Sequence, residues 1–145
     1  FEGTIDKLVA LAVLMPIVAG VGGNAGTQVL ALMVRGLALG QVGASNARTL
    51  LWKEVRVALL NGVMLGSVLG LIVLAWFHSP GLSAVIAIAL TCNLLFAALA
   101  GVLVPLTLKR FGFDPALASG IFLTAVTDSM GFFSFLGLAT LVLLH

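Results

Sequence analysis

Long apolar runs separated by short polar breaks dominate the sequence. Four such runs cover about residues 5–23, 55–77, 82–108 and 115–144. Each is close to or longer than the roughly 20 residues that a helix needs to cross a bilayer. The pattern therefore predicts an all-α fold, a polytopic transmembrane helix bundle with four long membrane helices, forming one domain over residues 1–145.

The breaks carry residues that typically end and begin helices. His78-Ser79-Pro80-Gly81 predicts a tight turn because of its Pro-Gly pair. Lys109-Arg110-Phe111-Gly112 joins a basic last turn to a glycine beyond it. Asp114 and Pro115 then predict the N-cap and the first residue of the last helix.

The end of the first run is different, because it is rich in glycine. Four glycines between Gly20 and Gly26 should weaken or break a helix, so we expect a glycine-rich break after the first membrane helix. Residues 28–39 are apolar but too short to cross the bilayer. They either lie along the membrane interface or continue the first helix beyond the glycines.

Composition places the chain in a lipid bilayer. Of the 145 residues, 61% are hydrophobic and only 8% are charged, whereas soluble domains carry about 25% charged residues. This excludes a soluble domain and a disordered chain. The net charge of +2 gives no reason to expect a nucleic-acid partner. The single cysteine, Cys92, lies in an apolar run and is expected to pack there.

The placement of the basic residues predicts the orientation. Six of the seven lie in or beside two connections, residues 24–54 and 109–114. The positive-inside rule makes these connections cytoplasmic and puts both ends of the chain outside, in a multi-pass protein of the cell (inner) membrane. An outside start at Phe1, which is not Met, suggests a fragment from which a preceding span was removed.

Asp128 is the main candidate for chemistry. It lies 13 residues into the last run, or about 20 Å along a helix, near the bilayer midplane. A carboxylate there costs about 2.5–3.5 kcal/mol on insertion scales, and no basic residue is placed at similar depth. We interpret Asp128 as a cation or proton site; the alternative is a protonated side chain bonded to a neighbouring helix. Thr124, on the same face, belongs to a strip of small residues that lines either a passage or a helix contact.

The glycine-rich segment supplies uncharged oxygen atoms at the other candidate position. Asn24, Thr27 and Gln28 follow Gly23, and freed carbonyl groups at membrane depth are tolerated where they meet water, protein or an ion. Oxygen ligands suit hard cations such as Mg²⁺ and Ca²⁺. The alternative is an ordinary glycine-rich turn that ends a helix.

These motifs resemble the MgtE magnesium transporter family. The resemblance rests on residues 16–28 (PIVAGVGGNAGTQ), 34–40 (VRGLALG), 113–116 (FDPA), 127–128 (TD) and 131–133 (GFF). They occur in the order expected of that family and cover nearly the whole chain.

The resemblance implies a homodimeric, channel-like Mg²⁺ transporter with five spans per subunit, of which this chain carries the last four. It implies a pore at the dimer interface, lined by the glycine-rich span and the last span, with Asp128 as the pore aspartate. The family's cytoplasmic N and CBS domains, which are regulatory partners, are absent here. Mg²⁺ would be held through its waters by Asp128, with Asn24, Gly23, Thr27 and Thr124 around it.

Two acidic residues at the cytoplasmic boundary have a second expected role. Asp114 is either a helix cap or a ligand of a regulatory Mg²⁺ cluster shared with the missing domains. Glu54 is either a solvated charge or a second ligand of that cluster.

Three other interpretations of Asp128 compete with this one. A proton- or sodium-coupled secondary carrier would show a similar midplane carboxylate. An intramembrane aspartic protease needs two paired carboxylates, which no second span supplies, so we expect no enzyme. A purely structural oligomer would tolerate loss of Asp128. We also expect Asn61 and Asn93 to bridge helices, and the glycine spacing at 62, 66 and 70 to favour close helix packing.

Overall fold

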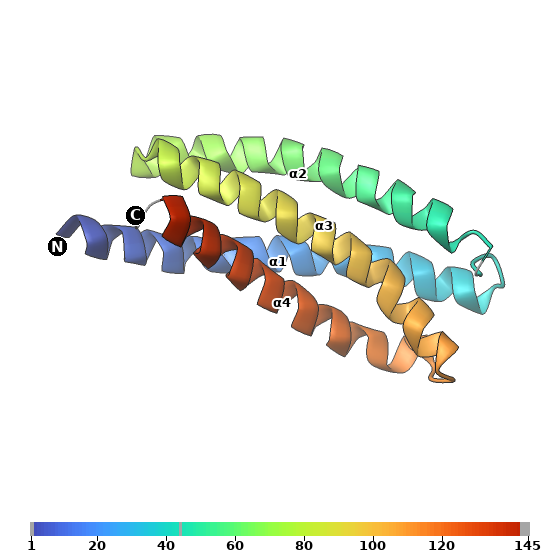
Figure 1. Cartoon of the computed structure of the whole chain (residues 1–145). Helices are drawn as coiled ribbons and strands as arrows, with labels where there is room; N and C mark the ends of the chain where they lie inside the picture. The colour runs from blue at the N-terminus through green and yellow to red at the C-terminus, as the bar shows by residue number, and fades with distance from the viewer. Residues whose placement is uncertain (1, 44, 143–145) are drawn as a thin grey trace.

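The computed structural model describes residues 2–43 and 45–142, and within them it forms four α-helices (Figure 1). These are α1 (Glu2–Ala38), α2 (Ala47–Phe77), α3 (Pro80–Arg110) and α4 (Pro115–Val142). All four contain stretches long and apolar enough to cross a membrane. The predicted all-α transmembrane bundle is therefore confirmed, and only the predicted end at residue 144 lies outside the described residues.

Helix α3 is the centre of the bundle. It packs against α1, α2 and α4, and α1 also packs against α4. Helix α2 lies along α3 on the side away from α4 (Figure 1). As a result, 61% of the α3 span is buried, against 22–39% of the other three.

Small residues at four-residue intervals set how closely the helices pack. On α2 the buried positions include Gly62, Gly66 and Gly70, which lie against α3. The Ser83 hydroxyl of α3 donates a hydrogen bond to the Gly70 carbonyl at 2.6 Å. The small-residue spacing predicted for close packing is thus confirmed.

The same spacing marks the inner face of α4. Its buried positions recur every fourth residue along the helix: Ser119, Leu123, Thr127, Gly131, Phe135 and Ala139. This i, i+4 stripe faces α1 and α3 and leaves the other faces of α4 uncovered.

The predicted glycine-rich break after the first helix is wrong. Helix α1 runs without interruption through Gly20–Gln28 to Ala38, so the alternative in which the first helix continues is right. Each glycine costs a helix about 1 kcal/mol relative to alanine in water. Within a membrane, however, a broken helix leaves backbone groups without partners, which costs more. Two glycines of α1 instead make room for neighbouring helices, Gly22 for Asn93 of α3 and Gly26 for Leu123 of α4.

This changes the boundaries of the first connection. Residues 24–38 belong to a membrane-spanning helix, and residues 47–54 begin α2, so the connection itself is only residues 39–46. Gly40 takes a positive φ of 71° in the turn, and Asn46 closes it by accepting a hydrogen bond from Gly43 N at 2.8 Å. This connection and residues 111–114 lie at one end of the bundle, opposite the N-terminus (Figure 1).

The α2–α3 turn, at the other end, follows the predicted chemistry. His78 ends α2 in the left-handed conformation, with φ of 53°. The Ser79 hydroxyl accepts a hydrogen bond from Leu82 N at 3.2 Å, and Pro80 is the first residue of α3. Trp52 and Trp76, near the two ends of α2, are 57% and 78% exposed, as interfacial residues are.

Candidate functional site

The candidate site forms where α1 and α4 cross in antiparallel directions. Small residues bring the two helices together at successive turns. A methyl group on Gly131 would lie 3.3 Å from Ala19 Cα, and one on Gly23 would lie 3.8 Å from the Thr127 hydroxyl oxygen. Further along, a methyl group on Gly26 would lie 2.9 Å from a Leu123 methyl carbon. The contact line therefore passes through the glycine-rich segment of α1.

Asn24 directly follows Gly23 on α1, and Asp128 directly follows Thr127 on α4. On a helix the next residue is rotated by about 100°. Because α1 and α4 are antiparallel, these two rotations turn both side chains to the same side of the contact line. Both residues are exposed. The structure thus brings together, on one uncovered face, two polar residues that are 104 positions apart in the sequence.

Thr27 and Thr124 extend this face by about one turn on each helix, and both are exposed. The Thr27 hydroxyl donates to the Gly23 carbonyl at 2.8 Å, and the Thr124 hydroxyl donates to the Gly120 carbonyl at 2.9 Å. Because their protons are used in these bonds, both hydroxyl oxygens remain as acceptors. We call Asn24, Thr27, Thr124 and Asp128 the polar face; it offers oxygen atoms and one carboxylate.

A shallow hollow lies beside the polar face. Its volume is about 680 Å³, and its lining residues are Ala116, Gly120, Ile121, Thr124 and Ala125. Four of these five are small, which explains why the surface of α4 recedes there. The hollow extends from the first turn of α4 toward Asp128.

Gly23 has a different place from the other predicted site residues. It is partly buried in the α1–α4 contact, and its carbonyl already accepts the Thr27 hydroxyl. Since the helix is unbroken there, its carbonyl is not freed as the sequence suggested. The oxygen atoms of the polar face are therefore those of side chains.

The two acidic residues at the boundary are not brought into one site. Asp114 Oδ1 accepts a hydrogen bond from Ala116 N at 3.0 Å, which makes it the predicted cap of α4. It also lines, with Lys109, a pocket of about 210 Å³ between the ends of α1, α3 and α4. Glu54 is on α2 and does not line that pocket. Among the residues that the structure describes, no three His, Cys, Asp or Glu side chains gather as a metal site would require.

The two asparagines expected to bridge helices behave differently. Asn93 is fully buried, and its Nδ2 donates to the Val18 carbonyl of α1 at 2.9 Å, which confirms a bridge between α3 and α1. Asn61 is exposed on α2, so its predicted bridge is wrong in this bundle. The sequence placed Thr127 in the TD motif but gave it no role at the site. It is buried and faces Gly23, and the four-residue stripe on α4 is the signal that identifies this position.

A bundle of helices able to span a membrane, with an uncovered polar face and a carboxylate midway along two of them, is typical of a membrane transport protein. Residues 15–138 match the family model of MgtE, described as a divalent cation transporter. The chain belongs to this MgtE family.

Three curated relatives bear the name magnesium transporter MgtE. The chain is 39% identical to the one from Enterococcus faecalis over 128 residues, covering 88% of this chain and 28% of the relative. The chain is 31% identical to the Bacillus subtilis protein, and the match covers 97% of this chain and 31% of the relative. It is 35% identical to the Thermus thermophilus protein, and that match covers 99% of this chain and 32% of the relative. The chain thus spans less than a third of the length of each relative.

Proposed function

We propose that this chain is the transport domain of a Mg²⁺ transporter, with a channel-like pore at a homodimer interface and Asp128 binding the hydrated cation near the midplane. The names of its relatives support Mg²⁺ as the transported ion. The domain provides a path for an ion and performs no enzymatic reaction.

The observation that carries the proposal is the exposure of the polar face at membrane depth. Asp128 and Asn24 are exposed midway along helices whose exposed side chains are mostly apolar. In a single copy surrounded by lipid, this arrangement would leave a carboxylate in hydrocarbon, which is strongly unfavourable. A second copy related by a two-fold axis covers the face and gives both carboxylates a shared, hydrated space.

The chemistry of the polar face suits a hydrated Mg²⁺ ion. Mg²⁺ gives up its waters reluctantly and is held by one or two carboxylates. Two copies of Asp128 supply that charge, while Asn24, Thr27 and Thr124 accept hydrogen bonds from the waters. Gly23 contributes through its carbonyl, which accepts the Thr27 hydroxyl and so orients Thr27.

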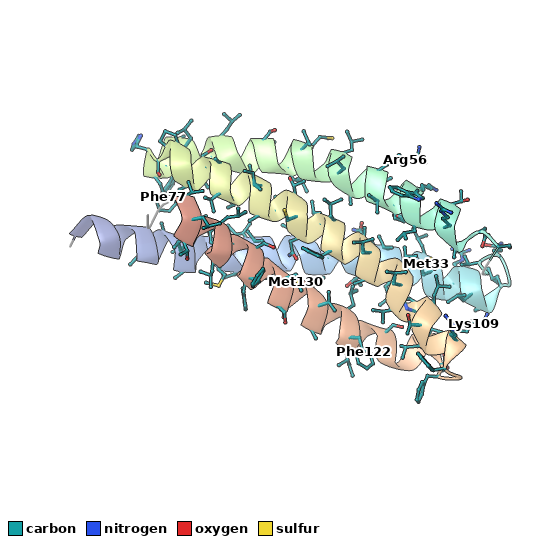
Figure 2. All side chains as sticks on the ribbon, viewed as in Figure 1. Met33, Arg56, Phe77, Lys109, Phe122 and Met130 are labelled. Carbon is teal, nitrogen blue, oxygen red and sulfur yellow. The ribbon has the colours of Figure 1, made fainter. Side chains whose placement is uncertain are left out.

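The remaining parts of the proposal concern orientation and regulation. The end that holds residues 39–46 and 111–114 faces the cytoplasm, and both ends of the chain face outward. Figure 2 places Arg56 and Lys109 toward that end, as the positive-inside rule requires.

Cytoplasmic domains of the longer protein dock there. Asp114 is a ligand for a regulatory Mg²⁺ ion shared with those domains; Glu54 lies apart from it on α2 and does not join this site.

The test is Mg²⁺ uptake into liposomes by the full-length protein and its Asp128→Asn variant. We expect Asp128→Asn to abolish uptake without altering dimerisation, and Asp128→Glu, which keeps the charge, to retain part of it. Undiminished uptake by Asp128→Asn would overturn the proposal. Uptake that requires an imposed proton or sodium gradient would favour the coupled carrier, so the assay is run with and without each gradient.

A further inference from the structure

Asn93 lies where three helices meet, and it belongs to the helix that does not carry the polar face. Its side chain is 0% exposed, and its Nδ2 donates to the Val18 carbonyl at 2.9 Å. In an α-helix that same carbonyl accepts the amide of Gly22, four residues on. The Asn93 amide is thus fixed to the turn of α1 that leads to Asn24.

Glycines on both neighbouring helices make room for this amide. A methyl group on Gly22 would overlap Asn93 Nδ2 and lie 2.8 Å from its Cγ. A methyl group on Gly131 would lie 3.0 Å from the same Nδ2. Gly131 is three residues beyond Asp128 on α4. The amide is therefore held between the two helices that carry the polar face, within one turn of its central residues.

The amide is an expensive group to bury at this place. Asn93 Oδ1 is buried and has no hydrogen-bond partner among the described residues. An unsatisfied buried acceptor destabilises a fold, whereas an apolar side chain of similar shape can be neutral or stabilising. The amide therefore does more than fill space, because it ties α3 to one particular carbonyl of α1.

We propose that Asn93 is a positioning residue for the ion pathway. Its hydrogen bond to Val18 fixes the rotation of α1 about its own axis, and its contact with Gly131 fixes the distance of α4. Together they keep Asn24 and Asp128 on the same side of the α1–α4 contact. This inference rests on the proposed function, because it assigns to α3 the control of the two helices that line the pore.

The first experiment replaces the amide by an apolar side chain with the same number and branching of heavy atoms. Asn93→Leu is made in the full-length protein, with Asn61→Leu as the matched control on the exposed face of α2. We expect Asn93→Leu to melt at the same or a higher temperature, and its maximal rate of Mg²⁺ uptake to fall about two- to tenfold, the range that loss of one buried hydrogen bond corresponds to. Asn61→Leu should leave both unchanged. Wild-type uptake by a folded Asn93→Leu overturns the proposal.

The second experiment separates positioning from space filling, and it decides the matter if Asn93→Leu does not fold. Gly22→Ala should lower both the melting temperature and uptake, because the added methyl group meets the amide. In Gly22→Ala/Asn93→Ser the shorter side chain makes room but no longer reaches Val18. We expect the melting temperature to recover and uptake to stay low. Recovery of both would show that Asn93 only fills space.

The two proposals fail in different ways in this assay. If Asp128→Asn transports normally, the carboxylate-centred pore is wrong whatever Asn93 does. If Asp128→Asn is inactive but Asn93→Leu transports like the wild type, only the positioning role is lost.

Discussion

Gly23 of α1 faces Thr127 of α4, where a methyl group on Gly23 would lie at an ordinary van der Waals distance, 3.8 Å, from the Thr127 hydroxyl oxygen. The two residues therefore lie on the faces that α1 and α4 turn toward each other. The residues that follow them, Asn24 and Asp128, consequently turn to one side, where both are exposed. A glycine that suggested a broken helix is therefore part of the α1–α4 contact, beside the candidate ion path.

The proposed homodimer predicts which surface faces the second copy. In a Cys92→Ala background, Thr124→Cys on the polar face should be joined to its counterpart by a short bifunctional thiol reagent, because a two-fold axis at this face brings the two copies together. Leu71→Cys is the control, since Leu71 is 67% exposed on α2, which lies away from α4. The product is measured as a dimer band in membranes.

Preferential cross-linking of Leu71→Cys would place the interface on α2 and leave Asp128 toward lipid. Equal cross-linking of both positions at high dilution in lipid would indicate random collision. Only a dimer specific to Thr124→Cys agrees with the proposal.

Much of the fold follows from hydropathy and helix-terminal residues. The third span, expected at 82–108, is observed at Pro80–Arg110, and the last begins at Pro115 as expected. These ends are encoded locally, by Ser79-Pro80 and by Asp114-Pro115. Their side chains cap the helices regardless of the rest of the bundle.

The features that could not be predicted from the sequence depend on whether a side chain faces a neighbouring helix or the outside of the bundle. Asn61 and Asn93 are the same residue type at similar positions in their spans, yet one is exposed and the other bridges helices. Likewise, the glycines of α1 appear unfavourable by helix propensity. Their benefit lies in contacts with residues about 70–100 positions away, such as Asn93 and Leu123, which local patterns do not encode.

The α2–α3 contact predicts a sharp difference between two glycines. A methyl group on Gly62 would lie 2.9 Å from Thr91 Cα, a backbone atom that cannot move without shifting α3. Gly62→Ala should therefore destabilise the bundle by about 1–3 kcal/mol. Around Gly137 on α4 there is open space, so Gly137→Ala should be neutral or stabilising by up to about 1 kcal/mol. Melting temperatures in detergent test this, and equal shifts would contradict the packing.

Asp114 has two roles that one pair of variants can separate. Asp114→Ala removes the cap whose Oδ1 accepts from Ala116 N at 3.0 Å and should cost about 1 kcal/mol of stability. Asp114→Ser keeps a capping oxygen but removes the charge, so it should melt like the wild type. If Asp114 is also a regulatory Mg²⁺ ligand, both variants should need more cytoplasmic Mg²⁺ to close the pore. Normal closure by Asp114→Ser would limit Asp114 to capping.

The orientation of the bundle is open to direct measurement. Phe113 is 64% exposed in the α3–α4 connection, and His78 is exposed in the α2–α3 turn at the other end. With Cys92→Ala as background, a membrane-impermeant maleimide added to intact cells should label His78→Cys and spare Phe113→Cys. Inside-out vesicles should give the reverse, because the basic residues keep residues 39–46 and 111–114 in the cytoplasm. Labelling of Phe113→Cys from outside would invert the bundle and would place Asp114 and its pocket out of reach of any cytoplasmic domain.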